Sequence, residues 1–240
     1  MLRYSRYMTT IAANLQAVRA RIALACAKAA RPVDSVQLLA VSKTWPAQAI
    51  AEAVDAGQRL FGESYVQEAL DKQAALLQFG DGGSEKLEWH FIGPLQSNKT
   101  RPVAEQFDWV HSVDRLKIAE RLSAQRPLQR GLLQVCLQVN ISGEATKSGC
   151  APEAAMQLAK DVARLPNLRL RGLMAIPEPA EDLAVQEDGF SRVRRLFDEI
   201  VATGQSLDTL SMGMSHDLEA AIMQGATMVR VGTAIFGERH

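Results

Sequence analysis

The stretch VQLLAVSKTWP, residues 36–46, contains the pattern that decides the fold. Five of its first six residues are apolar, and the stretch then passes through Ser42 and Lys43 to Pro46, where a helical pattern begins and continues to residue 57. A short apolar run followed by polar residues and an amphipathic segment is typical of a buried strand, a loop and a covering helix. These residues are therefore predicted to form one β/α unit.

The same unit recurs along the sequence. Short apolar or β-branched runs predict strands at residues 36–43, 59–63, 87–92, 109–113, 132–140, 168–175, 209–214 and 228–235. Amphipathic segments between them predict helices at residues 46–57, 65–78, 97–106, 115–125, 151–165, 188–203 and 216–225. Strands that alternate with helices indicate βα units and a parallel sheet.

The number of units favours an α/β fold of one kind, a single (β/α)8 TIM-type barrel with an added N-terminal helix. The run LLQVCLQVN (132–140) is apolar without clean alternation, as expected for a strand covered on both sides. Eight units in 240 residues match the usual barrel size of about 250 residues. A doubly wound open sheet is the alternative, although no GxGxxG motif follows the first strand. Because no Pro/Gly/Ser-rich linker divides the sequence, one domain over residues 1–240 is expected.

The N-terminal region is predicted to add a helix at residues 9–30, preceded by a flexible extension at residues 1–8. An apolar stripe supports the helix, and its residues are Ile11, Leu15, Val18, Ile22 and Ala25. Residues 1–33 also contain no Asp or Glu, a bias that mitochondrial transit peptides share. The stripe favours the helix over that alternative.

Composition excludes several classes of partner. Lys plus Arg and Asp plus Glu both number 27, so no overall field attracts nucleic acid or an anionic membrane. No apolar run approaches the roughly 18 residues that span a bilayer. The three cysteines are far apart, and the four histidines lack metal-ligand spacing. We therefore expect a cytoplasmic protein that binds neither metal, nucleic acid nor membrane.

Polar residues gather where the predicted strands end, and in a barrel this is where the chemistry lies. They are Lys43 and the polar residues of the stretches GES (62–64), HFIGPLQSNK (90–99), ISGEATKSG (141–149), SMGMSHD (211–217) and MVRVGTAIFG (228–237), while the sixth predicted strand ends in the apolar stretch GLMAIP (172–177). Ser215 directly precedes a predicted helix, whose N-terminal amides favour an anion. Gly232 permits close approach of backbone to a ligand, and Thr233 adds a hydroxyl. Together they predict a phosphate site after strands seven and eight.

Two cations are predicted inside the barrel. Arg230 lies between Val229 and Val231 in an enclosed strand, which is costly unless the guanidinium is paired, for example with Glu63, or addresses a ligand. If Leu39 and Val41 face inward, alternation turns Lys43 inward too. Desolvation and a neighbouring like charge would lower the pKa of Lys43 and make it a nucleophile toward an aldehyde. A phosphorylated pyridine aldehyde would suit an amine, a phosphate cradle and a cation so arranged.

Eight ordered motifs carry a resemblance to a known family. LLAVSKTWP, LFGESYVQEA, WHFIGPLQSNK, HSVDR, VNISGEATKSG, GLMAIP, SMGMSHDLEAAI and MVRVGTAIFG resemble the pyridoxal-phosphate homeostasis proteins over about residues 10–238. The resemblance implies a single barrel related to the N-terminal domain of alanine racemase. It also implies pyridoxal 5′-phosphate held as a Schiff base on Lys43.

The resemblance extends to further site residues. It implies that Ser215, Gly232 and Thr233 contact the phosphate and that Arg230 faces the pyridine nitrogen. Ser64 is a further candidate cofactor contact, although the family usually has Asn there. The family also commonly has Asp where this sequence has His216, which we expect at the first position of its helix. The remaining candidates for contact with the cofactor are His90, Met174, Lys99 and Lys147.

The expected function is to bind, buffer or deliver the cofactor, without strong turnover. Arginine only donates hydrogen bonds, so a pyridine nitrogen facing Arg230 stays unprotonated and is a weak electron sink. Racemases take an opposing tyrosine from an added domain, whereas this sequence ends three residues after Gly237 and has Tyr4, Tyr7 and Tyr65. A monomer is expected, with apo-enzymes as transient partners and Lys99 or Lys147 as a second imine site during transfer. The alternatives are a cofactor-dependent amino-acid enzyme such as a racemase, or a Schiff-base aldolase that uses Lys43 without a cofactor.

Overall fold

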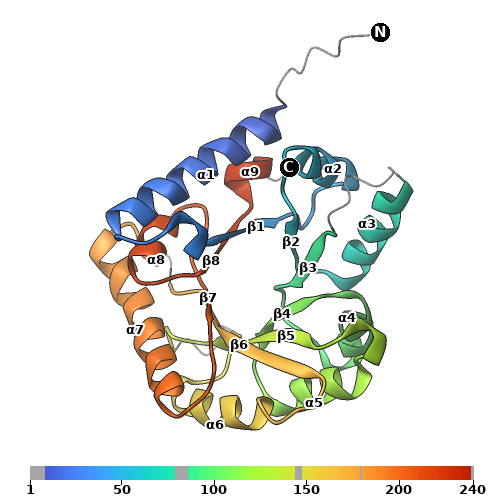
Figure 1. Cartoon of the computed structure of the whole chain (residues 1–240), viewed down its shortest axis with the longest axis vertical. Helices are drawn as coiled ribbons and strands as arrows, with labels where there is room; N and C mark the ends of the chain where they lie inside the picture. Colours follow the sequence, from blue (N-terminus) through green and yellow to red (C-terminus); the bar gives the residue numbers. More distant parts are fainter. Residues whose placement is uncertain (1–8, 79–85, 144–147, 179, 239–240) are drawn as a thin grey trace.

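Eight parallel strands form a closed barrel within the residues that the computed structural model describes, which are 9–78, 86–143, 148–178 and 180–238. The strands are β1 Gln37–Val41, β2 Leu60–Glu63, β3 Glu88–Phe91, β4 Trp109–Val113, β5 Leu133–Val139, β6 Leu168–Ala175, β7 Thr209–Ser211 and β8 Met228–Val231. Each strand pairs with the next, and β8 pairs with β1 to close the ring (Figure 1). The predicted barrel is confirmed.

Helices surround the barrel (Figure 1). They are α1 Thr10–Lys28, α2 Ala47–Asp55, α3 Val66–Gln78, α4 Thr100–Gln106, α5 Leu116–Gln125, α6 Pro152–Val162, α7 Leu183–Ala202, α8 Leu218–Met223 and α9 Thr233–Phe236, with single 3₁₀ turns at Val33–Ser35, Ser97–Lys99 and Leu128–Arg130. Each strand is followed by a covering helix, as in a barrel built from βα units, and the longest connection runs from Val139 at the end of β5 to Pro152 at the start of α6.

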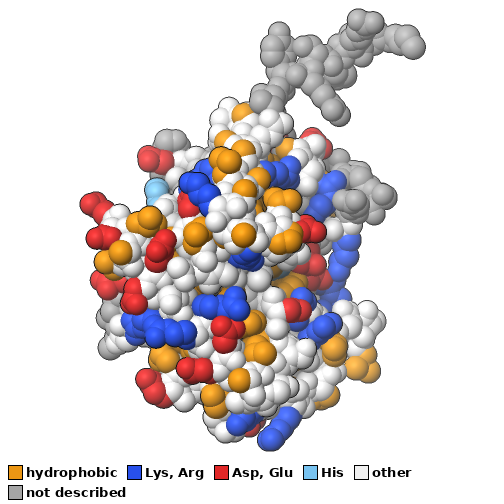
Figure 2. All heavy atoms as spheres, turned by 60° about the vertical axis from the view of Figure 1, so that its left-hand side comes forward, with side chains coloured by type: hydrophobic (Ala, Val, Ile, Leu, Met, Phe, Trp, Pro, Cys, Tyr) orange, Lys and Arg blue, Asp and Glu red, His pale blue; other side chains and the backbone are white. Residues whose placement is uncertain are grey.

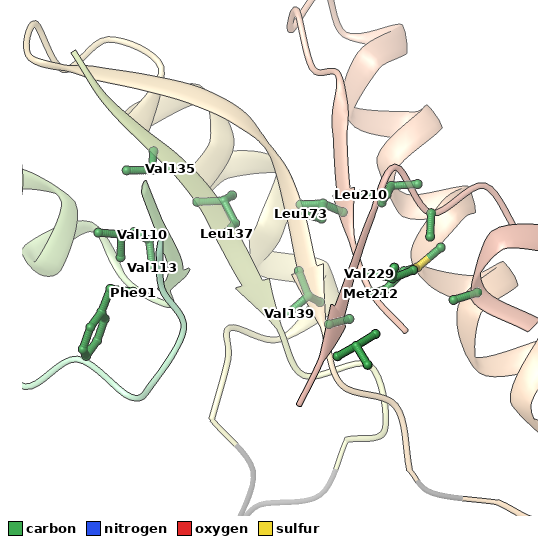
Figure 3. Close-up of a cluster of buried hydrophobic side chains, with 14 of the residues drawn as sticks. Phe91, Val110, Val113, Val135, Leu137, Val139, Leu173, Leu210, Met212 and Val229 are labelled. Carbon is green, nitrogen blue, oxygen red and sulfur yellow. The ribbon is translucent and has the colours of Figure 1, made fainter. Parts of the chain in front are cut away.

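Two apolar layers hold the barrel together. The outer layer fills the space between strands and helices, and Figure 3 shows part of it, with buried side chains from several strands, among them Val110, Leu137 and Leu173. The inner layer is separate and consists of Trp109, Cys136 and Met174 from three neighbouring strands. Because side chains alternate along a strand, each of these three strands supplies both layers. This explains why the strands read as continuous apolar runs.

Several boundaries differ from the sequence prediction. Strand eight was predicted to reach residue 235, but β8 ends at Val231 because Gly232, with φ −113° and ψ −75°, leaves the extended conformation and starts α9. The helix predicted from residue 188 begins at Leu183, since the carboxylate of Asp182 accepts a hydrogen bond from the amide of Ala184. Both differences lie at caps, where local hydrogen bonds decide the end of an element.

The added N-terminal helix is present as α1. Thr9 caps it by accepting a hydrogen bond from the amide of Ala12, and its apolar stripe is buried from Leu15 to Ala25 and half-buried at Ile11. It lies beside α8 and α9, so the first helix of the chain covers the end of the last β/α units (Figure 1). The predicted flexible extension at residues 1–8 lies outside the described residues.

The surface matches the balanced composition. Figure 2 shows acidic and basic side chains mixed across the face it presents. Among the described helices, none has the length and apolar character needed to cross a membrane. In the same part of the chain, no group of three or more His, Cys, Asp or Glu side chains is arranged to hold a metal ion.

Candidate functional site

Lys43 lies half-buried just after the end of β1, at the C-terminal mouth of the barrel. In the β1–β8 register Leu39 pairs with Arg230, so these two side chains share one side of the barrel wall. Alternation along β1 turns Val41, its last residue, to the same side, and Lys43 follows two residues later in the turn. The register therefore sets the strand that leads to Lys43 beside the strand that carries Arg230.

A network of hydrogen bonds supports the turn that contains Lys43. Lys72 Nζ of α3 donates to the carbonyl oxygen of Ser42 at 2.8 Å, and the amide of Thr44 donates to Glu68. Thr44 adopts φ +70°, a left-handed conformation that is uncommon for threonine. The amide of Trp45 closes the turn by donating to Ser42 O at 3.0 Å. The backbone on both sides of Lys43 is thus fixed.

Arg230 is nearly fully buried, with 4% of its surface exposed. Its Nη1 donates to the carbonyl oxygen and the hydroxyl of Ser211, and its Nη2 donates to the carbonyl oxygen of Ala175 at 3.0 Å. Burial lowers the pKa of Arg230 to about 10, which keeps the guanidinium charged at neutral pH. These three bonds use three of its five N–H donors, which leaves capacity for another acceptor.

The suggested pairing of Arg230 with Glu63 is wrong. Glu63 Oε1 instead accepts hydrogen bonds from Lys72 and from the Ser42 hydroxyl at 2.8 and 2.7 Å. Phe61, two residues before Glu63, packs in the outer layer, so alternation along β2 turns the carboxylate away from the barrel interior. Glu63 supports the turn at Lys43 from the helix side.

The predicted phosphate residues meet at the start of α9. The hydroxyl of Ser215 accepts a hydrogen bond from the amide of Ala234 at 3.4 Å, and Thr233 is exposed as the first residue of α9. A Cβ on Gly232 would lie 3.2 Å from the carbonyl oxygen of Val41, two residues before Lys43. Gly232 therefore lets the segments carrying Ser215, Thr233 and Lys43 approach one another.

Ser215 was expected at the N-terminus of the helix that follows it, and the structure corrects this. That helix, α8, begins only at Leu218, and its N-cap is Asp217, whose carboxylate also accepts a hydrogen bond from the amide of Met214. His216 is exposed and precedes the N-cap, so it does not occupy the first helical position. The acidic group in this loop is supplied one residue later, by Asp217.

Helix α1 holds this end of the barrel from outside. Arg21 donates to the carbonyl oxygen of Ser215 at 2.9 Å and binds Glu219 of α8 through two hydrogen bonds. Asn14 donates to the carbonyl oxygen of Ile235 in α9 at 2.9 Å. The added helix thus fixes both segments that form the predicted phosphate cradle.

The other predicted cofactor contacts lie at different depths in the barrel. Ser64 is half-buried directly after β2, and a Cβ on Gly93 would lie 2.3 Å from its carbonyl oxygen, so only glycine fits beside it. His90 and Met174 lie deep inside the barrel, below the mouth. Lys99 is exposed in the 3₁₀ turn Ser97–Lys99. Lys147 lies outside the described residues.

Sequence reasoning assigned no role to three residues that support the site, namely Lys72, Arg21 and Ser211. Ser211 carried a signal, because it is a polar residue between Leu210 and Met212 in a predicted strand. Lys72 carried a weaker one, as it follows Glu68 by four residues on a helix. Arg21 carried none, since its contacts join segments 194 and 198 residues apart.

Comparison with known proteins places this geometry in a family. Residues 13–240 match the family profile of the alanine racemase N-terminal domain. The chain is 61% identical over 232 residues to the pyridoxal phosphate homeostasis protein of Pseudomonas aeruginosa, a match that covers 97% of each chain. It is 53% identical to the protein of the same name from Escherichia coli. The chain belongs to the pyridoxal phosphate homeostasis protein family.

Solved structures agree with this family membership. PipY of Synechococcus elongatus, determined with pyridoxal phosphate bound, is 39% identical, matches with a TM-score of 0.81 and covers 95% of this chain and 100% of its own. An alanine racemase of Clostridium difficile matches with a TM-score of 0.73 at 15% identity, over 96% of this chain and 57% of that one, which shows a shared fold. Pyridoxal phosphate homeostasis proteins and racemases thus have the same barrel in common.

Proposed function

We propose that this protein binds pyridoxal 5′-phosphate and serves in homeostasis of that cofactor, by holding it reversibly on Lys43 and buffering or delivering it. The observation that carries the proposal is that β1, the strand that leads to Lys43, pairs with the strand of the buried Arg230, while Gly232 lies close to Val41 at the end of β1. The names of the relatives and the cofactor bound to PipY support it.

The residues present fit the cofactor group by group. Arg230 retains N–H donors for an acceptor such as a pyridine nitrogen. Ser215, Gly232 and Thr233 offer hydroxyls and backbone at the start of α9, which suits a phosphate. Ser64, after β2, is close enough to the mouth to serve as a further polar contact.

The cofactor supplies an aldehyde when bound, and Lys43 supplies the amine. The Lys43 amine would condense with that aldehyde to a Schiff base, with release of one water, and hydrolysis would reverse the condensation. Reversibility is what a carrier needs, because the same bond both retains and releases its cargo.

The site supports binding more than turnover. Arg230 presents only donors, so a ring nitrogen facing it stays unprotonated and withdraws electrons weakly. A racemase also needs an acid or base opposite the lysine. Tyr65, the tyrosine among the described residues, has 57% of its surface exposed at the start of α3, while His90 and His111 use both ring nitrogens in hydrogen bonds with other side chains.

The first test is covalent capture. Purified protein incubated with pyridoxal phosphate is expected to show a visible imine band, and borohydride should fix the cofactor on the peptide that contains Lys43. Lys43→Ala should lose both signals, whereas Lys99→Ala should keep them. Capture on other lysines but not on Lys43, or no capture at all, would remove the proposal and leave the cofactor-free aldolase as the alternative.

The second test separates a carrier from an enzyme. Loaded protein is incubated with each L-amino acid in deuterated water, and exchange at Cα is followed by mass spectrometry. No exchange above that of free cofactor is expected. Exchange at a catalytic rate would replace the carrier by an amino-acid enzyme such as a racemase.

Transfer forms the last part of the proposal. Apo-enzymes that use the cofactor are the proposed partners, and Lys99 or Lys147 is proposed to accept the aldehyde during hand-over from a monomeric carrier. Transfer to an apo-enzyme is timed with Lys99→Ala and Lys147→Ala, and a slower rate is expected in at least one. Unchanged transfer rates in both variants would contradict a second imine site. Light scattering of the loaded protein measures its molecular mass and so tests whether the carrier is a monomer.

A further inference from the structure

A relay of hydrogen bonds crosses the barrel interior from the N-terminal mouth to Arg230. We use "relay" for the five side chains of Glu88, His90, His111, Ser211 and Arg230. Glu88 Oε1 lies 2.9 Å from His90 Nε2, His90 Nδ1 lies 2.9 Å from His111 Nε2, and His111 Nδ1 lies 2.8 Å from Ser211 Oγ. Arg230 Nη1 completes it by donating to Ser211 Oγ at 2.9 Å.

The relay passes through the barrel and does not run along its wall. His111 is on β4 and Ser211 is on β7, strands that are not neighbours, so their contact spans the interior. His90, His111 and Ser211 have no exposed surface. Trp109 stacks on the His90 ring at 5.3 Å and closes the space beside it. Water is therefore excluded from the middle of the relay.

The N-terminal end of the relay reaches solvent. The Glu88 side chain is 42% exposed and lines a cavity of about 340 Å³ at that mouth, together with Trp109 and Arg171. Contact with water allows the carboxylate to ionise, and its hydrogen bond to His90 lowers the pKa of Glu88 further. One end of the relay is thus an anion and the other end a cation.

These charges fix the direction of every hydrogen bond between them. An ionised carboxylate only accepts, so His90 must carry its proton on Nε2 and leave Nδ1 bare. His111 Nε2 must then donate to His90 Nδ1, which leaves His111 Nδ1 as an acceptor. The hydroxyl of Ser211 must donate to His111, and its oxygen accepts from Arg230.

The direction requires both imidazoles to be neutral. Burial lowers the pKa of His90 and lowers that of His111 well below its usual value, and neighbouring positive charge on Arg230 adds to the second effect. The charged groups that act on the pair are Glu88, Asp108 and Arg230. A neutral pair has one donor and one acceptor per ring, which is what a one-way relay needs.

We propose that Glu88 is a positioning residue for the cofactor site, because its ionised carboxylate locks the tautomers of His90 and His111 and thereby orients the Ser211 hydroxyl that holds Arg230. The proposal rests on the proposed role of Arg230 at the pyridine nitrogen. Hydrogen bonds in series polarise one another, so a Ser211 oxygen that donates its proton onward is a better acceptor for the guanidinium.

Replacing the carboxylate by an amide removes the lock. The side chain of Glu88→Gln can either accept or donate, so both directions of the relay become available. In the reversed direction the Ser211 oxygen accepts from His111 as well as from Arg230, and its own proton has no place in the relay. Arg230 is then held less firmly, while the volume of the side chain is unchanged.

The relay itself is tested in the full chain without cofactor. Long-range ¹H–¹⁵N spectra distinguish the two neutral tautomers of each imidazole, and single substitutions at His90, His111 and His216 assign the signals. Wild type should show His90 and His111 as Nε2–H tautomers, and Glu88→Gln should convert one or both to a mixture or to Nδ1–H. The matched control is Asp208→Asn, which changes a carboxylate that binds Arg171 beside the same mouth but lies outside the relay.

Two results would overturn the relay. The first is an Nδ1–H tautomer at either histidine in wild type. The second is the same response of the tautomers to Glu88→Gln and Asp208→Asn, which would mean that a general change of field at the mouth is responsible.

The link to the cofactor site is tested by titration with pyridoxal phosphate. Glu88→Gln should weaken binding about 3- to 10-fold, the size of one weakened hydrogen bond to a charged group, and Asp208→Asn should not. Altered tautomers with unchanged binding would overturn the positioning role. If wild type failed to bind the cofactor, the proposed function would fall, whereas the tautomers of the apo-protein would still decide the relay.

Discussion

The ammonium group of Lys72 donates a 2.8 Å hydrogen bond to the carbonyl oxygen of Ser42, the residue before Lys43. The same nitrogen lies 2.8 Å from Glu63 Oε1, in a pair whose side chains are at most 7% exposed. The second oxygen of Glu63 is buried and has no partner among the described residues, and burial raises the pKa of this carboxyl. The Lys72 side chain of α3 thus hydrogen-bonds both to the backbone of the turn that contains Lys43 and to the buried carboxyl group of Glu63.

Lys72→Met is therefore expected to be costly. Removing one member of a buried ion pair leaves the other charge uncompensated, which typically costs about 3–5 kcal/mol. Urea unfolding should show this loss in the free energy of unfolding. Lys86→Met is the control, because Lys86 is 75% exposed in its pair with Asp108, and exposed pairs are worth about 0–1 kcal/mol. Equal losses in the two variants would show that the buried pair does not support the turn.

The sequence was sufficient for the barrel. Period-2 alternation correctly predicted that Leu39 and Arg230 lie on one side of the wall, because strand geometry is local and side chains leave opposite faces in turn, whereas the inward direction of Lys43 stays a prediction. The strand ends then marked Lys43, Arg230 and Gly232, which the register brings to adjacent strands.

Contacts made by long side chains were beyond sequence reasoning. The choice of partner for Arg230 is an example, since Ser211 and Ala175 are set by the closure of the barrel and Glu63 turns away from it. The cap of α8 is another, because Asp217 and His216 are both polar and only the backbone path selects the first. Such choices depend on tertiary geometry, not on residue type.

The cysteines are expected to be unreactive in the folded protein. Burial raises the pKa of Cys136 to about 12 and that of Cys150 to about 11, and it also raises the pKa of Cys26. At pH 8 only about one Cys150 in a thousand would be the reactive thiolate. Iodoacetamide should therefore label none of the three quickly in buffer and all three in denaturant, as read by mass spectrometry. Rapid native labelling of Cys136 would contradict its place inside the barrel.

Stability should fall as the pH drops from 7.5 to 5.5. Burial lowers the folded-state pKa of His90 and of His111, so below about pH 6.5 the unfolded chain binds protons that the folded protein does not. The free energy of unfolding then rises with pH in this window, by at most about 1.4 kcal/mol per pH unit for each histidine, and levels off above it. Urea unfolding at several pH values measures the slope.

His111→Asn should flatten this pH dependence, because it removes one of the two buried groups. His216→Asn is the matched control, since His216 is exposed, and it should leave the slope unchanged. Hydrogen bonds from Arg171 and Arg21 lower the pKa values of Asp208 and Glu219. Protonation of these two carboxylates would therefore reduce the free energy of unfolding only at a pH below this window. A slope that survives in His111→Asn at full size would contradict a neutral buried pair.

The link between α1 and the predicted phosphate cradle gives the last prediction. Arg21 donates to the carbonyl oxygen of Ser215 and binds Glu219, so Arg21→Ala should let the Ser215 loop move relative to α9. Affinity for pyridoxal phosphate should fall about 3- to 10-fold, or about 0.7–1.4 kcal/mol, because part of the binding free energy is then used to order the loop. The free energy of unfolding should change by no more than about 1 kcal/mol, because the pair with Glu219 is half-exposed.

Arg19→Ala provides the matched control on the same helix. Arg19 donates to the carbonyl oxygen of Ala56 and to the side chain of Gln58, near the opposite mouth of the barrel from Ser215. It should lower stability slightly and leave cofactor affinity unchanged. An equal fall in affinity for both variants would mean that α1 acts only through overall stability. No fall in either would mean that the Ser215 loop is held without Arg21, through contacts such as the bonds of Ser215 to Ala234 and of Met214 to Asp217. A fall in cofactor affinity confined to Arg21→Ala would show that helix α1 contributes to cofactor binding.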